Sequence, residues 1–307
     1  MTFKIQLIRY CSNHWPAVQA YHRLVYHLET CPEFENRVAL LSMLKQSPFT
    51  AKIRGFLVTE CPLWKLECLL GERWLVEDIY NALLELCYFS QSSKELSAET
   101  LLLPTSFLTD ACHAYSLFPR AYTPQILAFR HRVSNISVQS AAFSLVTDNH
   151  FTAYIFQRNS STIKYGDSMH QTPPSYMLPI LQWIFEGLFN VTSIVPGAIG
   201  MQGPGNGEGS CGVAAYNFIQ TSTGIERNMR KWSGNQAALF QKAALEDLLR
   251  YHQIANERDG TIDGWTRRIN GVDILDDTAI QEMPFPYGYR DFNLYVPLVH
   301  AVYLHTS

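Results

Sequence analysis

The N-terminal part of the chain has the hydrophobic pattern of helices. Apolar residues recur at every third or fourth position in residues 15–29 and again in residues 35–46, which predicts two helices. Residues 1–13 form an apolar stretch interrupted by polar side chains, and we expect a short strand there. A third helix is predicted over residues 72–89, where one apolar face contains Leu75, Ile79, Leu83 and Leu86.

The middle of the chain has the pattern of a sheet. Three runs rich in β-branched and aromatic residues are separated by polar turn residues, which predicts an antiparallel meander over 142–146, 151–156 and 162–166. A helix over residues 175–189 is expected next, with Pro179 near its start. Residues 191–195 then read as a buried strand that ends at a Pro-Gly pair.

A glycine-rich loop, GPGNGEGSCG, follows this strand at residues 203–212. Residues 211–220 are apolar nearly all round, as in a helix buried in the middle of a domain. Residues 235–256 have the pattern of an amphipathic helix that docks on the core. Residues 257–290 read as an irregular segment, and residues 294–304 fit a strand or a helix equally well.

Composition is that of a globular protein. The 307 residues are 47% hydrophobic and 17% charged, and a chain of this length can bury a sizeable core. The net charge of −3 does not favour nucleic acid as a partner. No apolar run approaches the roughly 18 residues of a membrane span, so we expect no membrane partner.

The seven cysteines are scattered and form no CxxC pair. This spacing argues against both a disulfide framework and a zinc ribbon, and it predicts a reducing, intracellular compartment. The thiol mechanism considered below needs no metal and no organic cofactor, and we expect neither.

Cys211 has the setting of a nucleophile. At the first turn of a helix, unpaired N–H groups and the positive end of the helix dipole favour a thiolate. The same N–H groups, together with those of the glycine loop, can hold a developing oxyanion.

A base and a residue that orients the base are also available. His150 opens the second strand of the predicted meander and Asp167 follows the third, so antiparallel pairing makes them neighbours. Gln202 carries a side-chain amide that can donate to an oxyanion. Asn206 and the loop's backbone amides are alternative donors.

Each feature also has a simpler interpretation. Cys211 alone fits a small buried hydrophobic residue, His150 a surface residue beside a turn, and Asp167 a turn or cap. The glycine loop suggests a phosphate site, but GxxxxGK[ST] is absent and GxGxxG is incomplete. The combination of these residues in one sheet, loop and helix favours catalysis.

The order His, Asp, Gln, Cys differs from that of papain, in which the cysteine comes first, and the QAC motif of caspases is absent. The chain resembles the ubiquitin-like-protein-specific cysteine proteases, the SUMO (sentrin) protease family in the clan of the adenoviral protease. The resemblance lies between residues 74 and 225, in RWLVEDIYNALL (73–84), NHFTAYIF (149–156), IKYGDSM (163–169) and QGPGNGEGSCGVAAYNFI (202–219).

The resemblance implies an α+β, papain-like cysteine protease fold, with a central mixed or antiparallel sheet flanked by helices and a buried nucleophile helix. It implies a protease domain over residues 71–307, in which residues 230–307 form an extension. Residues 1–70 are then a mostly helical extension packed on the core. Neither extension matches the family.

The resemblance also implies the site. Cys211, His150 and Asp167 correspond to the family's triad, and Gln202 corresponds to its oxyanion donor. Gln202 stands nine residues before Cys211, farther than in the family's usual pattern, which keeps Asn206 as an alternative.

Four further residues are implied to bind substrate. Trp74, Phe151 and Gly212 match positions around the narrow tunnel that admits a Gly-Gly tail. Glu77 matches the acidic position of the WLxD motif. The family usually has Trp where this chain has Phe151. This wall of the tunnel is therefore still aromatic, but it has no indole N–H.

The function implied is a monomeric thiol protease or isopeptidase that cleaves after the C-terminal Gly-Gly of ubiquitin or a ubiquitin-like modifier and acts on its protein conjugates. Three alternatives stay open: an acyltransferase of the same clan, a modifier-binding module without turnover, and a globular protein with a structural cysteine. An acyltransferase with a nucleotide donor needs a basic site, and no cluster of Lys and Arg near the motifs suggests one.

Overall fold

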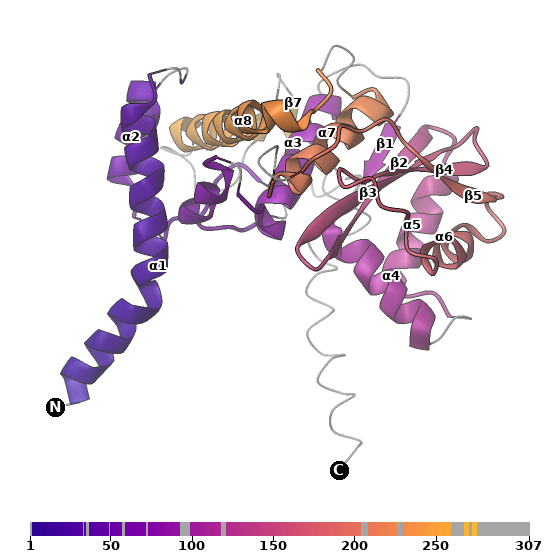
Figure 1. Ribbon diagram of the computed structural model, residues 1–307, viewed down its shortest axis with the longest axis horizontal. Helices are drawn as coiled ribbons and strands as arrows, with labels where there is room; N and C mark the ends of the chain where they lie inside the picture. The colour runs from indigo at the N-terminus through magenta and orange to yellow at the C-terminus, as the bar shows by residue number, and fades with distance from the viewer. Residues whose placement is uncertain are drawn as a thin grey trace.

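The structure is a computed structural model that describes residues 2–32, 34, 37–48, 50–56, 59–71, 73–92, 99–117, 121–203, 208–225, 230–258, 267–269 and 272–274. Its helices and strands are shown in Figure 1. The helices are α1 (Thr2–Thr30), α2 (Arg37–Gln46), η1 (Leu63–Leu69), α3 (Glu77–Ser92), α4 (Thr105–Leu117), α5 (Pro124–Ser134), α6 (Met177–Phe185), α7 (Cys211–Thr223), η2 (Gly234–Gln236) and α8 (Ala237–Arg258). The strands are β1 (Glu99–Leu102), β2 (Val138–Thr147), β3 (His150–Gln157), β4 (Thr162–Gly166), β5 (Ser193–Pro196), β6 (Arg267–Ile269) and β7 (Val272–Ile274).

Five of the described strands form one mixed sheet in the order β1-β2-β3-β4-β5. The central pairs β2–β3 and β3–β4 are antiparallel, whereas β1 and β5 join the two edges in parallel. The predicted meander is therefore confirmed, and so is the predicted α+β class with a mixed sheet flanked by helices. The sequence patterns did not predict β1, α4 or α5.

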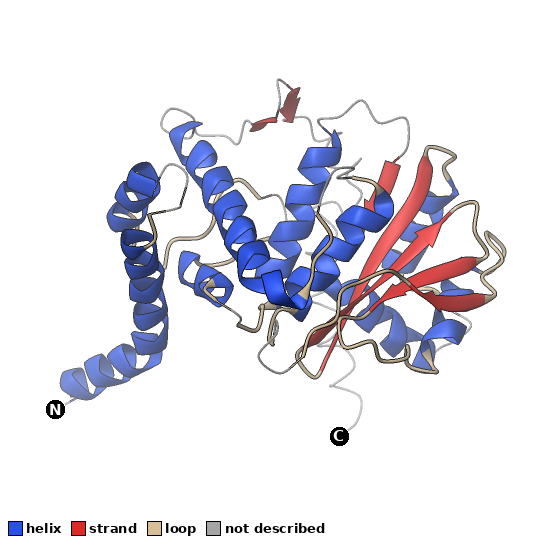
Figure 2. Cartoon of the chain, turned by 45° about the horizontal axis from the view of Figure 1, so that its top comes forward, coloured by secondary structure: helices blue, strands red, loops and turns tan. Residues whose placement is uncertain are grey.

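The sheet is covered on both faces (Figures 1 and 2). Along β3, Phe151 and Ile155 belong to the hydrophobic cluster that includes α3, α7 and α8. Tyr154 and Phe156 alternate with them and belong to a second cluster, which includes α4, α5 and α6. Because successive side chains of a strand point to opposite faces, a strand buried on both sides needs an almost continuous apolar run, as β3 has.

The N-terminal strand predicted over residues 1–13 is wrong, because residues 2–13 are part of α1. The helical pattern of residues 15–29 supplies a stable helix, and adding residues to an existing helix gains one hydrogen bond per residue without a new nucleation cost. The helix predicted over 35–46 corresponds to α2.

Two other predicted elements differ in detail. The third helix begins at Glu77 rather than at residue 72, and Trp74 and Leu75 precede it in a non-helical segment. Glu77 and Asp78 stand in its first turn, where negative charge stabilises the helix N-terminus. The strand expected at 191–195 is the edge strand β5, and it is only partly buried because β4 is its one partner in the described sheet.

Helices α6, α7 and α8 correspond to the helices predicted for the second half of the chain. Residues 294–304 and most of 257–290 lie outside the described residues, except for the short β6–β7 pair. Across the described residues, no helix combines the length and apolar character needed to cross a bilayer.

Helices α1, α2 and η1 pack on the side of α8 away from the sheet (Figures 1 and 2). Leu24, Leu28, Leu40 and Leu44 are buried and belong to the same cluster as Leu245 of α8. The hydroxyl of Tyr21 also donates to the Leu44 carbonyl at 2.5 Å, which ties α1 to α2. The domain boundary at residue 70 stays a prediction.

Helix α7 packs on the sheet at a point where two glycines make room for one phenylalanine. A Cβ added to Gly166 would lie 2.3 Å from the ring of Phe218, and a Cβ added to Gly197 would lie 2.4 Å from it. Real Cβ contacts essentially never fall below 3.0 Å. Phe218 therefore occupies a slot, which we call the Phe218 slot, between the end of β4 and the residue after β5.

We expect Gly166→Ala to destabilise the protein by about 1–3 kcal/mol, since the added methyl overpacks the Phe218 slot. Urea unfolding monitored by circular dichroism measures the change. Gly203→Ala is the matched control, because its added Cβ would meet no atom of the described residues within 4 Å, chain neighbours aside. Equal stability of the two variants would contradict the close packing described here.

Candidate active site

A tight hairpin places His150 at the edge of the sheet. Asp148 and Asn149 form the two-residue turn between β2 and β3, and their φ angles are 50° and 61°. Positive φ at both turn positions matches the right-handed twist of paired strands, and Asp and Asn tolerate it better than most residues. His150 therefore follows the turn directly and pairs with Thr147.

His150 and Asp167 are in contact, as antiparallel pairing of β3 and β4 predicts. Nε2 of His150 lies 2.7 Å from Oδ1 of Asp167. The Asp167 carboxylate also accepts the backbone N–H groups of Met169 at 2.8 Å and Gln171 at 3.1 Å, and the hydroxyl of Tyr165 at 3.3 Å. Asp167 is only 3% exposed, so these donors replace the water that a buried carboxylate loses.

Cys211 is the first residue of α7 and is fully buried. Its Sγ lies 3.8 Å from the carbonyl oxygen of Asn149, with the thiol as donor. The thiol is also near enough to the imidazole of His150 to raise its pKa, so the two side chains are neighbours. Gly209, two residues before Cys211, has a φ of 82°, a conformation that favours glycine.

The two nitrogens of His150 are not equivalent. Nε2 faces Asp167, whereas Nδ1 is buried and has no hydrogen-bond partner among the described residues. Burial would lower the pKa of His150, but the hydrogen bond with Asp167 and the nearby Cys211 thiol and Asp167 carboxylate outweigh this and raise it from 6.5 to about 9. The imidazolium form is therefore favoured at neutral pH.

The pKa of Asp167 is shifted in the opposite direction. Burial alone would raise it, but the hydrogen bond with His150 and those from the Met169 and Gln171 backbones lower it below its usual value. The pair is thus a carboxylate beside an imidazolium. A nucleophile, a base and a group that orients the base are the parts of a thiol acyl-transfer site.

Gln202 lies beside this group. Its backbone N–H donates to the Ser168 carbonyl at 2.8 Å, and its side-chain Oε1 accepts the Ser168 hydroxyl at 3.1 Å. Because Ser168 directly follows Asp167, the Gln202 amide is held next to the acidic residue. Asn206 lies outside the described residues, so its alternative role stays untested.

The segment before α3 packs against the start of α7. A Cβ added to Gly212 would lie 2.7 Å from Cδ2 of Leu75, so Gly212 allows this close contact. The Arg73 carbonyl accepts a hydrogen bond of 3.0 Å from Gln241 of α8. Between these two fixed points, the side chain of Trp74 is 52% exposed.

Glu77 and Phe151 differ in exposure. Glu77 is exposed at the start of α3, where it accepts a hydrogen bond of 2.9 Å from the Thr105 hydroxyl. Phe151 is only 2% exposed, and its ring stacks on Tyr80 with the ring centres 4.7 Å apart. In this structure Phe151 belongs to the core behind His150, whereas Trp74 and Glu77 are accessible.

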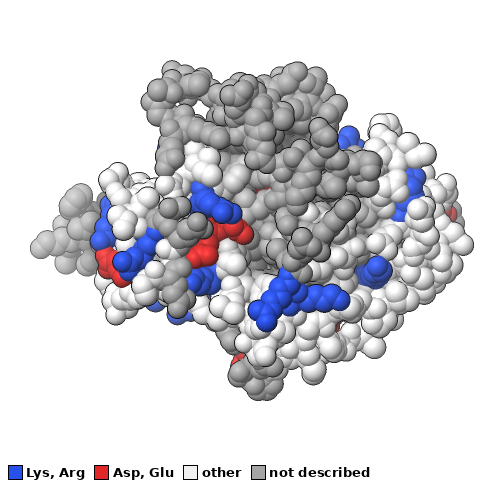
Figure 3. Space-filling view, turned by 90° about the horizontal axis from the view of Figure 1, so that it is seen from above, with Lys and Arg blue, Asp and Glu red and all other residues white. Residues whose placement is uncertain are grey.

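The charged side chains on the face shown in Figure 3 form several separate groups. Basic and acidic side chains adjoin one another on the left of this view, whereas the groups at the lower centre and on the right are basic. Arg23 and Arg73, for example, both pair with Glu67. Among the described residues, no group of three or more His, Cys, Asp or Glu side chains is arranged to hold a metal ion.

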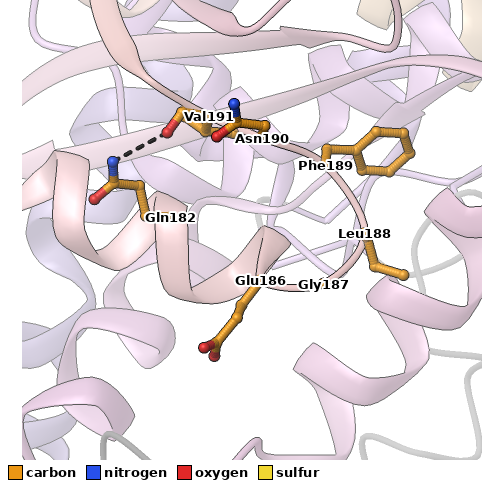
Figure 4. Close-up of a pocket in the computed structure, with 7 residues that line it drawn as sticks. All are labelled: Gln182, Glu186, Gly187, Leu188, Phe189, Asn190 and Val191. Atoms are coloured by element: carbon orange, nitrogen blue, oxygen red, sulfur yellow. Dashed lines mark hydrogen bonds between the residues drawn. The ribbon is translucent and has the colours of Figure 1, made fainter.

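A hollow of about 450 Å³ lies at the end of α6 (Figure 4). It is lined by Gln182, Glu186, Gly187, Leu188, Phe189, Asn190 and Val191. Gln182 belongs to α6, and the other residues lie in the segment between α6 and β5, which begins beside Thr162, the first residue of β4. Asp167 follows the opposite end of β4, so this hollow is separate from the candidate site.

Comparison with known proteins assigns the fold. No protein-family model matches the chain, and no curated protein matches it. The C-terminal Ulp1 protease domain in complex with Smt3, the yeast ortholog of SUMO, matches with a TM-score of 0.52 and 15% identity, over 72% of this chain and 97% of that one.

Another structure of the SUMO protease Ulp1, with its catalytic cysteine oxidised to a sulfenic acid, matches with a TM-score of 0.53 and 16% identity, over 72% of this chain and 98% of that one. A third, with the cysteine oxidised to a sulfinic acid, has a TM-score of 0.52 and 14% identity, with the same coverage. The chain has the fold of a cysteine protease domain. More particularly, it is the fold of the Ulp1 SUMO protease, which confirms the predicted fold class.

Sequence reasoning missed three contributors to the site: the Asn149 carbonyl, the Ser168 hydroxyl and the Tyr165 hydroxyl. The only signal for Ser168 was its place after Asp167, which reads equally well as a turn residue. The Asn149 carbonyl is a backbone group, so no residue type marks it.

We expect Asp167→Asn to lower the pKa of His150 by about 1 to 3, since the variant removes the negative charge beside the imidazole. In the natural protein, protonation of His150 stabilises the fold fully below pH 6.5, and this contribution is lost as the pH rises through about 9. NMR titration of the imidazole signal that disappears in His150→Gln measures the pKa.

Asp148→Asn is the control for this titration, because it removes an exposed carboxylate from the adjacent turn that forms no hydrogen bond with the ring in the described structure. The control should leave the midpoint near 9. An unchanged midpoint in Asp167→Asn would show that the carboxylate does not set the charge of His150.

Proposed function

We propose that this protein is a thiol protease or isopeptidase of the ubiquitin-like-protein-specific family, which cleaves after the C-terminal Gly-Gly of a modifier. The observation that carries the proposal is one juxtaposition. Cys211, at the N-terminus of a buried helix, lies beside His150, whose other nitrogen is held by Asp167. The Ulp1-like fold supports the same conclusion.

The mechanism follows from the different neighbours of the two imidazole nitrogens of His150. Cys211, as thiolate, attacks the carbonyl carbon of the terminal glycine, and Nδ1 of His150 carries the proton. The tetrahedral intermediate collapses to a thioester, and His150 gives its proton to the departing amine. A water molecule, deprotonated by His150, then attacks the thioester and releases the glycine carboxylate and the Cys211 thiol. Asp167 keeps Nε2 protonated throughout.

The oxyanion of each tetrahedral intermediate needs donors. Gln202 provides its side-chain amide, and Cys211 provides its own backbone N–H at the start of α7. Both donors are held in place before substrate binds, because one belongs to a helix terminus and the other is hydrogen-bonded to Ser168. Such preorganisation is what makes oxyanion donors effective.

The substrate lies against the segment before α3. Trp74 contributes an accessible aromatic face, Gly212 keeps the approach to Cys211 narrow, and Glu77 contacts the modifier's tail. Phe151 supports His150 from the core in this proposal and forms the inner end of the tunnel. The modifier's tail fits this narrow tunnel because its two final residues are glycines. A Cβ on either residue would clash with the tunnel wall.

The partner is a ubiquitin-like modifier of the SUMO type, together with its protein conjugates. The supporting observation is that the matched yeast protease domain was solved in complex with Smt3, the SUMO ortholog. We propose a monomeric, intracellular enzyme that needs no metal or organic cofactor.

We expect the natural protein to form a covalent adduct with one member of a panel of ubiquitin and ubiquitin-like modifiers carrying a C-terminal electrophile. Cys211→Ala and His150→Ala should both abolish the adduct, which mass spectrometry detects. Absence of an adduct with every member, from protein shown to be folded, would contradict the proposed function.

Cys68→Ala is the matched control for this experiment. Burial raises the pKa of the Cys68 thiol to about 12, so it is almost wholly protonated at neutral pH and a poor nucleophile. The control should react at the rate of the natural protein. A loss of reaction in Cys68→Ala would mean that the electrophile does not report on Cys211 alone.

We expect Trp74→Ala to slow adduct formation by about 10- to 30-fold while changing the free energy of unfolding by only about 0.5 kcal/mol, because a half-exposed aromatic contributes more to binding than to stability. Trp15→Ala is the control, since Trp15 is 58% exposed but lies on α1, on the other side of α8 from the sheet (Figure 1). Equal rates in the two variants would exclude Trp74 from the binding surface.

A further inference from the structure

Two chain segments meet beside the triad through a set of hydrogen bonds. One segment follows β4 and contains Asp167, Ser168 and His170, and the other follows β5 and contains Ile199 and Gln202. The Gln202 N–H donates to the Ser168 carbonyl at 2.8 Å, and the Ser168 hydroxyl donates to Gln202 Oε1 at 3.1 Å. A third contact of 3.1 Å joins His170 Nε2 to the Ile199 carbonyl.

The Ser168 hydroxyl stands out among these contacts because it acts on a side chain rather than on the backbone. Ser168 is 1% exposed and Gln202 is 9% exposed, so water does not compete freely for their hydrogen bond. A glutamine amide has a carbonyl end and an NH₂ end that differ chemically but have nearly the same shape. The hydroxyl holds the carbonyl end, so the NH₂ end is directed away from Ser168.

The backbone around Ser168 is fixed by the triad itself. The Asp167 carboxylate accepts the N–H groups of Met169 and Gln171, which folds the chain tightly around the acidic side chain. Ser168 lies inside this turn. The position of its hydroxyl is therefore coupled to the residue that orients His150.

The other segment is equally constrained. A Cβ added to Gly200 would lie 2.4 Å from the Trp232 carbonyl oxygen, so the segment runs in close contact with the chain before α8. Trp232 is tied to α7 in turn, because its N–H donates to Oδ1 of Asn217 at 2.7 Å. Gln202 thus reaches Ser168 from a backbone that has little freedom to move.

We propose that Ser168 is a positioning residue that orients the Gln202 amide as an oxyanion donor. The hydroxyl fixes which end of the amide faces the reacting carbonyl, and it does so before substrate binds. This inference rests on the proposed function. Orienting the Gln202 amide is a task that neither the triad residues nor the residues of the substrate-binding surface perform.

If Ser168 has this role, its removal should slow hydrolysis of a modifier substrate but not alkylation of Cys211. Hydrolysis of a modifier substrate passes through a tetrahedral oxyanion, whereas alkylation of Cys211 by iodoacetamide is a displacement at a saturated carbon and forms none. Loss of an oxyanion donor costs about 10²- to 10³-fold in kcat. We expect Ser168→Ala to lower kcat by about tenfold, with little change in KM and none in the rate or pH profile of alkylation.

A double-mutant cycle separates positioning from a general structural effect. If Ser168 acts through Gln202, then Ser168→Ala causes no further loss in a Gln202→Ala background. Ser168→Thr, which keeps the hydroxyl, should restore most of kcat. Thermal unfolding of each variant verifies that it is folded.

Ser140→Ala is the matched control. Ser140 is also a buried serine of the same sheet, 6% exposed and 2.7 Å from the Thr100 hydroxyl, but it pairs with Gln157 at the end of β3 away from His150. This control should lose a comparable hydrogen bond without any change in kcat.

The outcomes are distinguishable. If the natural protein turns over no modifier substrate, the proposed function fails, and the role of Ser168 fails with it. If the natural protein is active, an unchanged kcat in Ser168→Ala overturns only the role of Ser168. A parallel loss of hydrolysis and alkylation does the same, because it would place the effect on Cys211 and His150. Losses that add fully to those of Gln202→Ala would also overturn it.

Discussion

The close packing of α7 on the sheet is the constraint on which the candidate site depends. Phe218 fits between Gly166 and Gly197 because neither glycine has a side chain. Gly166 directly precedes Asp167, and Phe218 lies two helical turns from Cys211 on the same helix. One packing contact therefore sets how the helix that begins at Cys211 approaches the segments that carry His150 and Asp167. A helix held farther out by larger side chains would separate Cys211 from His150.

The polar part of the site is stable because its charges are paired and hydrogen-bonded. Burial disfavours the charged form of His150, yet its neighbours raise its pKa to about 9. Burial likewise disfavours the Asp167 carboxylate, which nevertheless keeps a lowered pKa because it accepts several hydrogen bonds. Each group depends on the other to stay charged in a site from which water is largely excluded. Removing either side chain takes away one of the interactions that keep its partner charged.

The helices outside the motif-bearing core also contribute to the site. Gln241 of α8 holds the Arg73 carbonyl, and Leu75 packs on Gly212, so the segment that presents Trp74 is fixed between α8 and α7. The N-terminal helices pack on α8 through a shared hydrophobic cluster. They therefore support the outer layer on which this segment rests, although α1 and α2 lie on the other side of α8 from α7 in Figure 1.

Sequence alone determined the elements with strong periodicity: the central meander, the buried helix that starts at Cys211, and the neighbouring positions of His150 and Asp167. These depend on side-chain alternation and strand order, which are local. Only the tertiary structure decided the pairing of Ser168 with Gln202, the Phe218 slot, and the burial of Phe151, because each joins residues far apart in the chain. It also decided that α1 continues to Thr2, since helix length depends on propagation from stable turns as much as on local pattern.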